Sequence, residues 1–238
     1  MRRSYTDPTG MTAEDPIYGT NFWGNLKYLG DDGKNNGRVY FVSGKIKRNV
    51  KQATENGEFY SDSLNSSDEV SSVPSQMAFA VDESVQATKS SKRENGGHNI
   101  FSNPSTVQWD EGPEVEQLKV ENGIMTRGSV TPFVVDGQKM DIGLGDLDVY
   151  YHIHPNTKGL GSSSPSYYSI NVNGRTMRRG DIPYQAVLQR RGYSGNPFVI
   201  GAGDNRVRFY NGSGTVMKVK YQQFITALLS EFFSNIRF

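Results

Sequence analysis

The alternation of apolar and polar residues in the second half of the chain predicts β-structure. After the adjacent glycines of ENGGHNIF, alternating segments recur at 116–120, 128–135 and 147–154, separated by Asn-Gly and Asp-Gly pairs that favour tight hairpins. Three further short segments with glycine-rich turns follow, NPFVIGAG, NRVRFYNG and TVMKVK. These segments are typical of the strands of a sheet.

Helical spacing of apolar residues appears mainly after residue 180. A helix is expected to start near Asp181, with that aspartate as N-cap, a proline in the first turn and a glycine as the stop. Weaker helical patterns run from Lys45 to Glu55 and from Asp82 to Arg93. The last 18 residues place eight apolar residues on one helical face, which predicts a helix packed on the core: Tyr221, Phe224, Ile225, Leu228, Leu229, Phe232, Phe233 and Ile236.

The first 65 residues carry turn and loop clusters around one short strand-like segment, GRVYFVSG. A serine-rich stretch gives way to an apolar segment between residues 60 and 75, where we place a boundary. We expect residues 1–65 to be a linker that contributes little to the core, and residues 66–238 to be the folded domain. The whole pattern predicts an α+β fold, a mixed or curved β-sheet flanked by helices and preceded by an irregular N-terminal region.

The amino-acid composition excludes some kinds of functional site and disfavours others. The 238 residues include no cysteine, which excludes disulfide scaffolds, thiolate metal sites and cysteine nucleophiles. The 26 basic and 25 acidic residues are spread along the chain and give a formal net charge of +1, so a nucleic-acid partner and a nuclease activity are disfavoured. The chain has neither a membrane-span length of apolar residues nor the apolar core of a signal peptide, so we expect a soluble protein without a membrane span.

Two of the three histidines lie one residue apart on a predicted strand, in VYYHIHPN. His152 and His154 would face the same side, with Cβ atoms about 7 Å apart. A catalytic zinc usually takes three protein ligands, so two histidines would need a carboxylate. His98 lies on the strand after Glu94 and is more often a packing histidine than a ligand. An economical design is therefore two histidines, one aspartate and a separate glutamate that accepts a proton.

These residues resemble the signature of the JAMM or MPN-type (JAB-like) zinc metalloproteases, which is a glutamate in an E-x-x-G context, then H-x-H-P, then a serine and an aspartate. RENGGHNIF resembles the first element, with Glu94 ahead of two glycines, and HIHP matches the second, with His152, His154 and Pro155. The resemblance covers about residues 75 to 220. It implies a JAMM-like fold, a Zn²⁺ cofactor held by both histidines, Glu94 as the general base, and hydrolysis of an amide bond in a protein or peptide substrate.

The third element of the signature departs from the family pattern. In an ungapped register the aspartate position falls on Ser166, which cannot replace a carboxylate ligand. A longer loop, with a small hairpin around Asn173-Gly174, would instead make Asp181 the third ligand, since Asp181 opens a helix as the family's aspartate does. Asp146 and Asp148 are the alternatives, and an N-cap role without any metal is the competing explanation of Asp181.

The serine of the signature is also displaced. Ser163, Ser164 and Ser166 all compete for the role of hydrogen bonding the developing oxyanion, and we assign it to Ser164. If the carboxylate ligand were missing, the chain would instead be a catalytically inactive JAMM-like module that binds a protein partner.

A second resemblance concerns the beginning of the chain. YTDPTGM resembles the segment that closes the shell of Rhs-type bacterial polymorphic toxins, and the residues up to about 45 resemble the linker that follows it. This resemblance implies a C-terminal toxin cassette, secreted or delivered into a target cell by a bacterial secretion system and neutralised by a cognate immunity protein.

Overall fold

The structure is a computed structural model that describes residues 14–61, 64, 69–114, 116–120, 123–127, 129–155, 164–166, 168–172 and 175–236. These residues form four helices and sixteen strands in several sheets, a mixed α+β arrangement as expected. The helices are α1 (Gly44–Glu55), α2 (Met77–Ser91), α3 (Asp181–Arg190) and α4 (Tyr221–Asn235). Among the described residues, no helix is both long enough and apolar enough to cross a membrane.

The largest sheet has six strands and carries the histidine pair. Its order is β16-β15-β14-β11-β5-β6, and only β11 and β14 run parallel. The carboxyl ends of these two strands therefore meet at one edge of the sheet, where His154 pairs with Gly201. The strand bounds are β5 (Asn95–Ile100), β6 (Asn103–Gln108), β11 (Leu147–His154), β14 (Phe198–Gly201), β15 (Arg206–Asn211) and β16 (Gly214–Lys220).

A second sheet is built from the N-terminal part of the chain, in the order β2-β1-β3-β4. Its strands are β1 (Pro16–Thr20), β2 (Leu26–Asp31), β3 (Arg38–Val42) and β4 (Val70–Pro74), and α1 packs on it through the buried Ile46 and Val50. The expectation of an irregular linker is thus wrong for the described residues between 14 and 61. The expected boundary at residue 65 lies between two strands of one sheet, since β4 pairs with β3.

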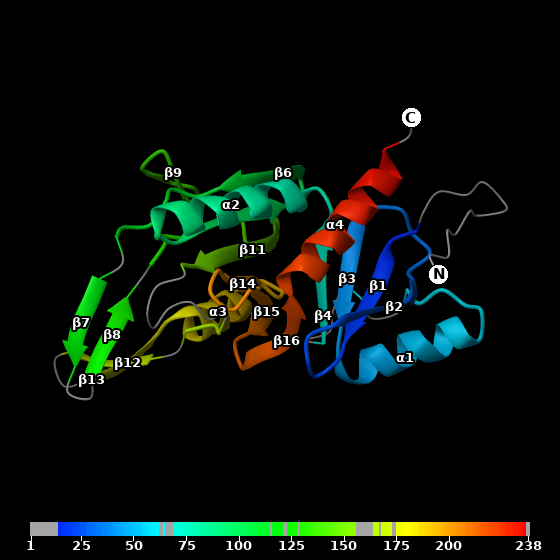
Figure 1. The fold of residues 1–238 in the computed structure, drawn as a ribbon, viewed down its shortest axis with the longest axis horizontal. Coiled ribbons are helices and arrows are strands. Elements are labelled where there is room, and N and C mark those ends of the chain that lie inside the picture. Colours follow the sequence, from blue (N-terminus) through cyan, green and yellow to red (C-terminus); the bar gives the residue numbers. More distant parts are fainter. Residues whose placement is uncertain are drawn as a thin grey trace.

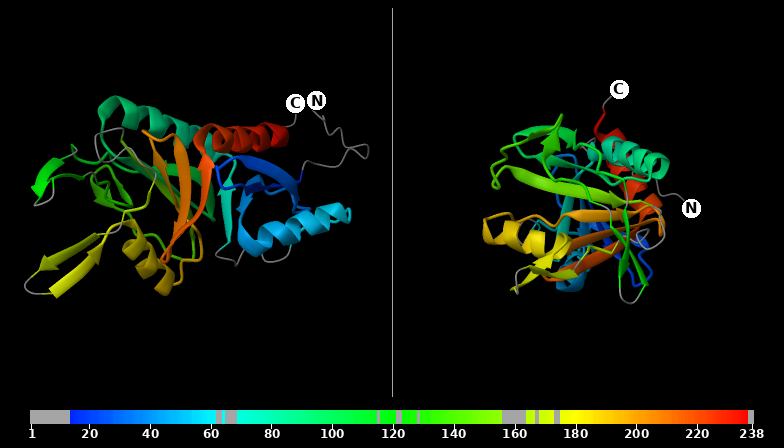
Figure 2. Two further views of the ribbon diagram at one scale, coloured as in Figure 1. Left: turned by 60° about the horizontal axis from the view of Figure 1, so that its bottom comes forward. Right: turned by 90° about the vertical axis from the view of Figure 1, so that its left-hand side faces the viewer.

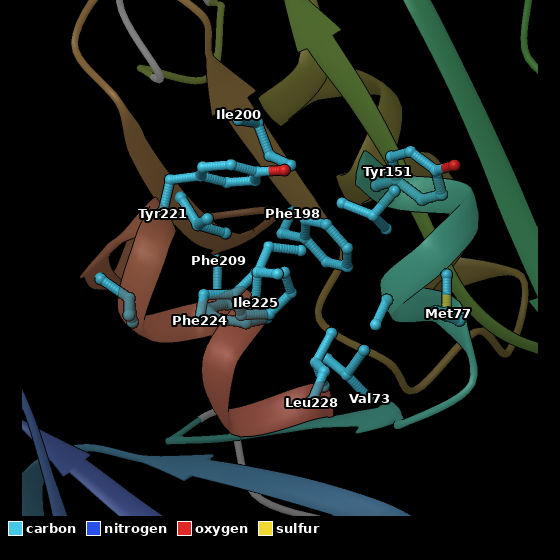
Figure 3. Packing of buried hydrophobic residues seen from close by; sticks show 14 of the residues in the cluster. Val73, Met77, Tyr151, Phe198, Ile200, Phe209, Tyr221, Phe224, Ile225 and Leu228 are labelled. Atoms are coloured by element: carbon cyan, nitrogen blue, oxygen red, sulfur yellow. The ribbon is translucent and has the colours of Figure 1, made fainter. Parts of the chain in front are cut away.

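One hydrophobic core joins the two sheets. Val39 and Phe41 of β3 belong to the same buried cluster as the strands β11, β14 and β15 and the helices α2 and α4. The Phe41 ring lies 5.2 Å from that of Phe209 and 5.4 Å from that of Phe224, centroid to centroid. Figure 3 shows the centre of this cluster, where residues of α2 and α4 pack with Tyr151 and Phe198. The N-terminal residues therefore help to form the core.

The alternation along β11 separates this core from the candidate site. Val149, Tyr151 and Ile153 point into the core under α2 and α4, so His152 and His154 point to the opposite face of the sheet. On that face, α3 packs through Leu188 against a smaller aromatic cluster that contains Tyr150 and Trp109. The prediction that both histidines face the same side of the strand is confirmed.

Three two-stranded hairpins complete the fold: β7 (Glu116–Val120) with β8 (Gly123–Arg127), β9 (Val134–Val135) with β10 (Gln138–Lys139), and β12 (Tyr168–Val172) with β13 (Arg175–Arg179). The first and the last project from the end of the molecule opposite α1, whereas α2 and α4 follow one another along one side (Figures 1 and 2). The hairpin predicted around Asn173-Gly174 is confirmed by the pairing of β12 with β13.

The helices agree with the sequence pattern except at some ends. The helix predicted for Lys45 to Glu55 is α1, whereas α2 starts five residues before the predicted Asp82. Helix α4 buries the first half of the predicted stripe, but Phe233 is 55% and Ile236 38% exposed. These two residues were wrongly assigned to the core, since the buried residue of the last turns of α4 is Glu231, which is 4% exposed.

Candidate metal centre

Two neighbouring side chains of β11 form the centre of the site. His152 and His154 are each 6% exposed, and their Nε2 atoms lie 3.1 Å apart. Strands β5 and β14 flank β11 on its two sides, since His152 pairs with Gly96 of β5 and with Val199 of β14. Gly96 has no room for a side chain, because a Cβ there would lie 2.8 Å from the Trp109 ring. Gly96, within β5, therefore allows close packing beside the histidines.

Asp181 reaches the histidines from α3. Its Oδ2 lies 3.4 Å from Nε2 of His152 and 3.9 Å from Nε2 of His154. In a tetrahedral zinc site with bonds of about 2.0 to 2.1 Å, the ligand atoms lie about 3.3 Å apart. The ligand atoms of these three residues all lie within 4.8 Å of one another, so they fit one small metal ion.

The sequence predicted that Asp181 caps its own helix, but its carboxylate makes no such cap. Gly180 occupies the N-cap position with a φ of 104°, and Asp181 is the first residue of α3. The backbone N–H of Ser166 donates to Asp181 Oδ2 over 2.6 Å, and the backbone N–H of Asp181 donates to Ser166 Oγ over 3.0 Å. A Cβ at position 180 would lie 2.6 Å from Ser166 Oγ, so glycine is required for this contact.

Glu94 lies beside His152, His154 and Asp181. It is 5% exposed, and its Oε1 lies 4.0 Å from Nε2 of His154. Burial raises the pKa of Glu94 to about 7 and the charge of Asp181 adds to this rise, while His152 and the backbone N–H of Val130 act in the opposite direction. A carboxyl group with a pKa near neutrality can both accept and release a proton.

The acidic side chains of the site favour a positive charge beside them. Burial lowers the pKa of His152, but the carboxylates of Asp181 and Glu94 outweigh this effect and raise it above the usual value. Burial raises the pKa of Asp181, yet the histidines and the Ser166 amide outweigh that effect and hold it well below the usual range. The buried carboxyl group of Glu94 and the partly buried carboxylate of Asp181 therefore favour a positive charge between the histidine rings, which a divalent metal ion would provide.

The other candidate residues lie elsewhere or make other contacts. Asp146 is exposed, and Asp148 pairs with Arg38 through two hydrogen bonds of 2.9 and 2.7 Å. Ser164 is exposed, and Ser163 lies outside the described residues. His98 is fully buried, and its Nδ1 accepts a hydrogen bond of 2.8 Å from the indole of Trp109. Burial lowers the pKa of His98 to about 4, so its ring is neutral and packs among aromatic residues.

Two contacts of the site were not foreseen from the sequence. Ser166 was considered only as an oxyanion donor, yet it holds Asp181. Val130 was not considered, and its backbone amide hydrogen bonds to Glu94. Neither has a sequence signal of its own, because the first depends on a loop meeting a helix and the second is a main-chain contact.

Comparisons with models of protein families, with curated proteins and with solved structures gave no match for this chain. Its function must therefore be inferred from the residues themselves.

Proposed function

We propose that the chain is a zinc-dependent peptidase or isopeptidase of the JAMM type. The observation that carries the proposal is the convergence of His152, His154 and Asp181, with Glu94 beside them, from separate parts of the chain. They also occur in the order of the JAMM signature, with the glutamate before the paired histidines and the aspartate after them. The bound zinc ion would polarise the scissile carbonyl and acidify a water molecule.

The protein's own residues would perform the remaining steps. His152, His154 and Asp181 would hold the ion and fix its position at the carboxyl end of β11. Glu94 would accept a proton from the attacking water at its carboxylate and deliver it to the leaving amine. Its pKa of about 7 suits both transfers at neutral pH. Ser164 would hydrogen bond the oxyanion, a role that rests on the family resemblance.

The proposal includes a biological setting, which rests on the resemblance of the first 45 residues to an Rhs-type junction. In that setting the chain is the toxin domain of a bacterial effector, delivered by a secretion system and neutralised by a cognate immunity protein. Its substrate would be a protein or peptide of the target cell.

Zinc content and toxicity of three variants test the enzymatic proposal. Asp181→Ala should lose zinc, because it removes a ligand, whereas Glu94→Gln should keep zinc and lose toxicity when expressed inside a bacterium. Asp146→Asn is the matched carboxylate control, since Asp146 is exposed, and it should retain both properties. Zinc would be measured by mass spectrometry of the purified proteins. Toxicity that persists in Glu94→Gln would favour an inactive module that acts by binding a partner.

A further inference from the structure

The three proposed ligands come from two elements, so the position of α3 against β11 decides whether a metal site exists. His152 and His154 belong to β11 and Asp181 to α3. The chain between them spans 26 residues, from 155 to 180, and includes the projecting hairpin β12–β13. Such a long connection does not by itself fix a helix with the precision that a metal site requires.

A buried hydrogen bond joins β11 to α3 directly beside the site. The hydroxyl of Tyr150 donates to Oε1 of Gln185 over 2.8 Å, and Nε2 of Gln185 donates to the carbonyl oxygen of Gly195 over 3.0 Å. Tyr150 is 2% exposed and Gln185 is 0% exposed. Gln185 and Leu188 are the buried residues of α3, so one of the two buried side chains of this helix is polar.

The spacing of these two residues relates them to the proposed ligands. Tyr150 precedes His152 by two positions on a strand, so both point to the same face. Gln185 follows Asp181 by four positions on a helix, so both lie on the same side. The contact between Tyr150 and Gln185 therefore lies next to the contact between His152 and Asp181.

We infer that Tyr150 and Gln185 are positioning residues, which set α3 against β11 so that Asp181 meets the two histidines at metal-ligand distance. The inference rests on the proposed metal site. A buried glutamine on a short helix is costly unless the oxygen and the nitrogen of its side-chain amide both find partners, and here both do. The pair therefore favours one position of α3, because sliding the helix would leave the buried amide of Gln185 without its partners.

Cobalt binding to the full chain tests this inference. Co²⁺ has visible absorption bands whose intensity and position report its coordination geometry, which a general loss of stability does not change in the folded protein. Tyr150→Phe and Gln185→Met should bind Co²⁺ about 10 to 100 times more weakly than the wild type, as is usual when a group that orients a ligand is lost. Their spectra should shift, and the double variant should lose no more affinity than either single variant.

Tyr193→Phe is the matched control. The buried Tyr193 hydroxyl donates to the backbone oxygen of Asp148 over 3.2 Å, so its loss costs a similar hydrogen bond in the same aromatic cluster. This control should bind Co²⁺ with wild-type affinity and spectrum. Wild-type spectra in both Tyr150→Phe and Gln185→Met would overturn the positioning role alone. A wild-type chain that binds no Co²⁺ would overturn the proposed metal site and this inference with it.

Discussion

Ser166 and Asp181 hold one another through two hydrogen bonds, in which each backbone N–H donates to the side chain of the other residue. The donor to Asp181 Oδ2 is a backbone amide, and the same oxygen is the one closest to His152. The segment from 164 to 166 therefore orients the carboxylate that faces both histidines. It does so across 15 residues of chain, which is why no local pattern revealed it.

Ser166→Ala should weaken zinc binding by about tenfold, because the N-terminus of α3 loses the hydroxyl that accepts the Asp181 N–H. Ser164→Ala should leave zinc affinity unchanged and reduce toxicity, because its proposed partner is the oxyanion of the substrate. Zinc affinity would be measured by competition with a chelating dye. The reverse outcome, with zinc affinity lost in Ser164→Ala and kept in Ser166→Ala, would exchange the two roles.

The ion pair of Arg38 with Asp148 links the N-terminal sheet to the strand that carries the histidines. Asp148 is 4% exposed in its side chain, so Arg38→Ala would leave a buried carboxylate without its partner. We expect the free energy of unfolding to fall by about 3 kcal/mol, as measured by urea denaturation. Adding Asp148→Asn to this variant should restore part of the loss. An unchanged unfolding curve in Arg38→Ala would show that the pair does not stabilise the fold.

A fragment of residues 66–238 should not fold. It would lack β1, β2 and β3, and with them Val39 and Phe41, whose contacts with Phe209 and Phe224 belong to the main core. Near-ultraviolet circular dichroism and thermal unfolding would test this, with a chain that begins at residue 14 as the control. Cooperative unfolding of the shorter fragment would restore the boundary that the sequence suggested.

The sequence predicted best those elements whose pattern is local. The segment 147–154 was recognised in full as a strand, because turn residues bound it and its face assignment needs only alternation. Helix α1 was recognised because its pattern ends just before Gly57, a residue that adopts the left-handed conformation with a φ of 77°. The site residues were found for a similar reason, since Glu94 and the histidine pair lie in short motifs.

Long-range contacts explain what the sequence did not predict. The N-terminal sheet was missed because its strands are short and its turns are held by distant polar groups. Asp15, for example, accepts hydrogen bonds from the backbone amides of Asn36, Gly37 and Arg38. Such contacts leave no period in the sequence. The same holds for the contact of Tyr150 with Gln185, which depends on how a helix meets a strand.

The last prediction concerns Glu231, a 4% exposed carboxyl group near the end of α4. Burial raises its pKa to about 7, and the charges of Asp15 and Asp31 add to the rise, while hydrogen bonds from Asn235 and Ser234 oppose it. The folded chain therefore holds a proton on Glu231 more tightly than the unfolded chain does. Stability from this group is fully present below the ordinary pKa of 4.5 and is lost as the pH rises to about 7.

Glu231→Gln should remove this dependence, because an amide resembles the protonated acid and does not ionise. We expect the variant to be more stable than the wild type at pH 8 by about 1 to 2 kcal/mol, and to differ little from it at pH 4. Urea unfolding at several pH values would measure both differences. Glu55→Gln is the matched control, since Glu55 lies at the exposed end of α1 with its side chain 65% exposed, and it should change neither value appreciably. A Glu231→Gln variant that is less stable than the wild type at pH 8 would mean that the charged form of Glu231 is favoured in the folded chain.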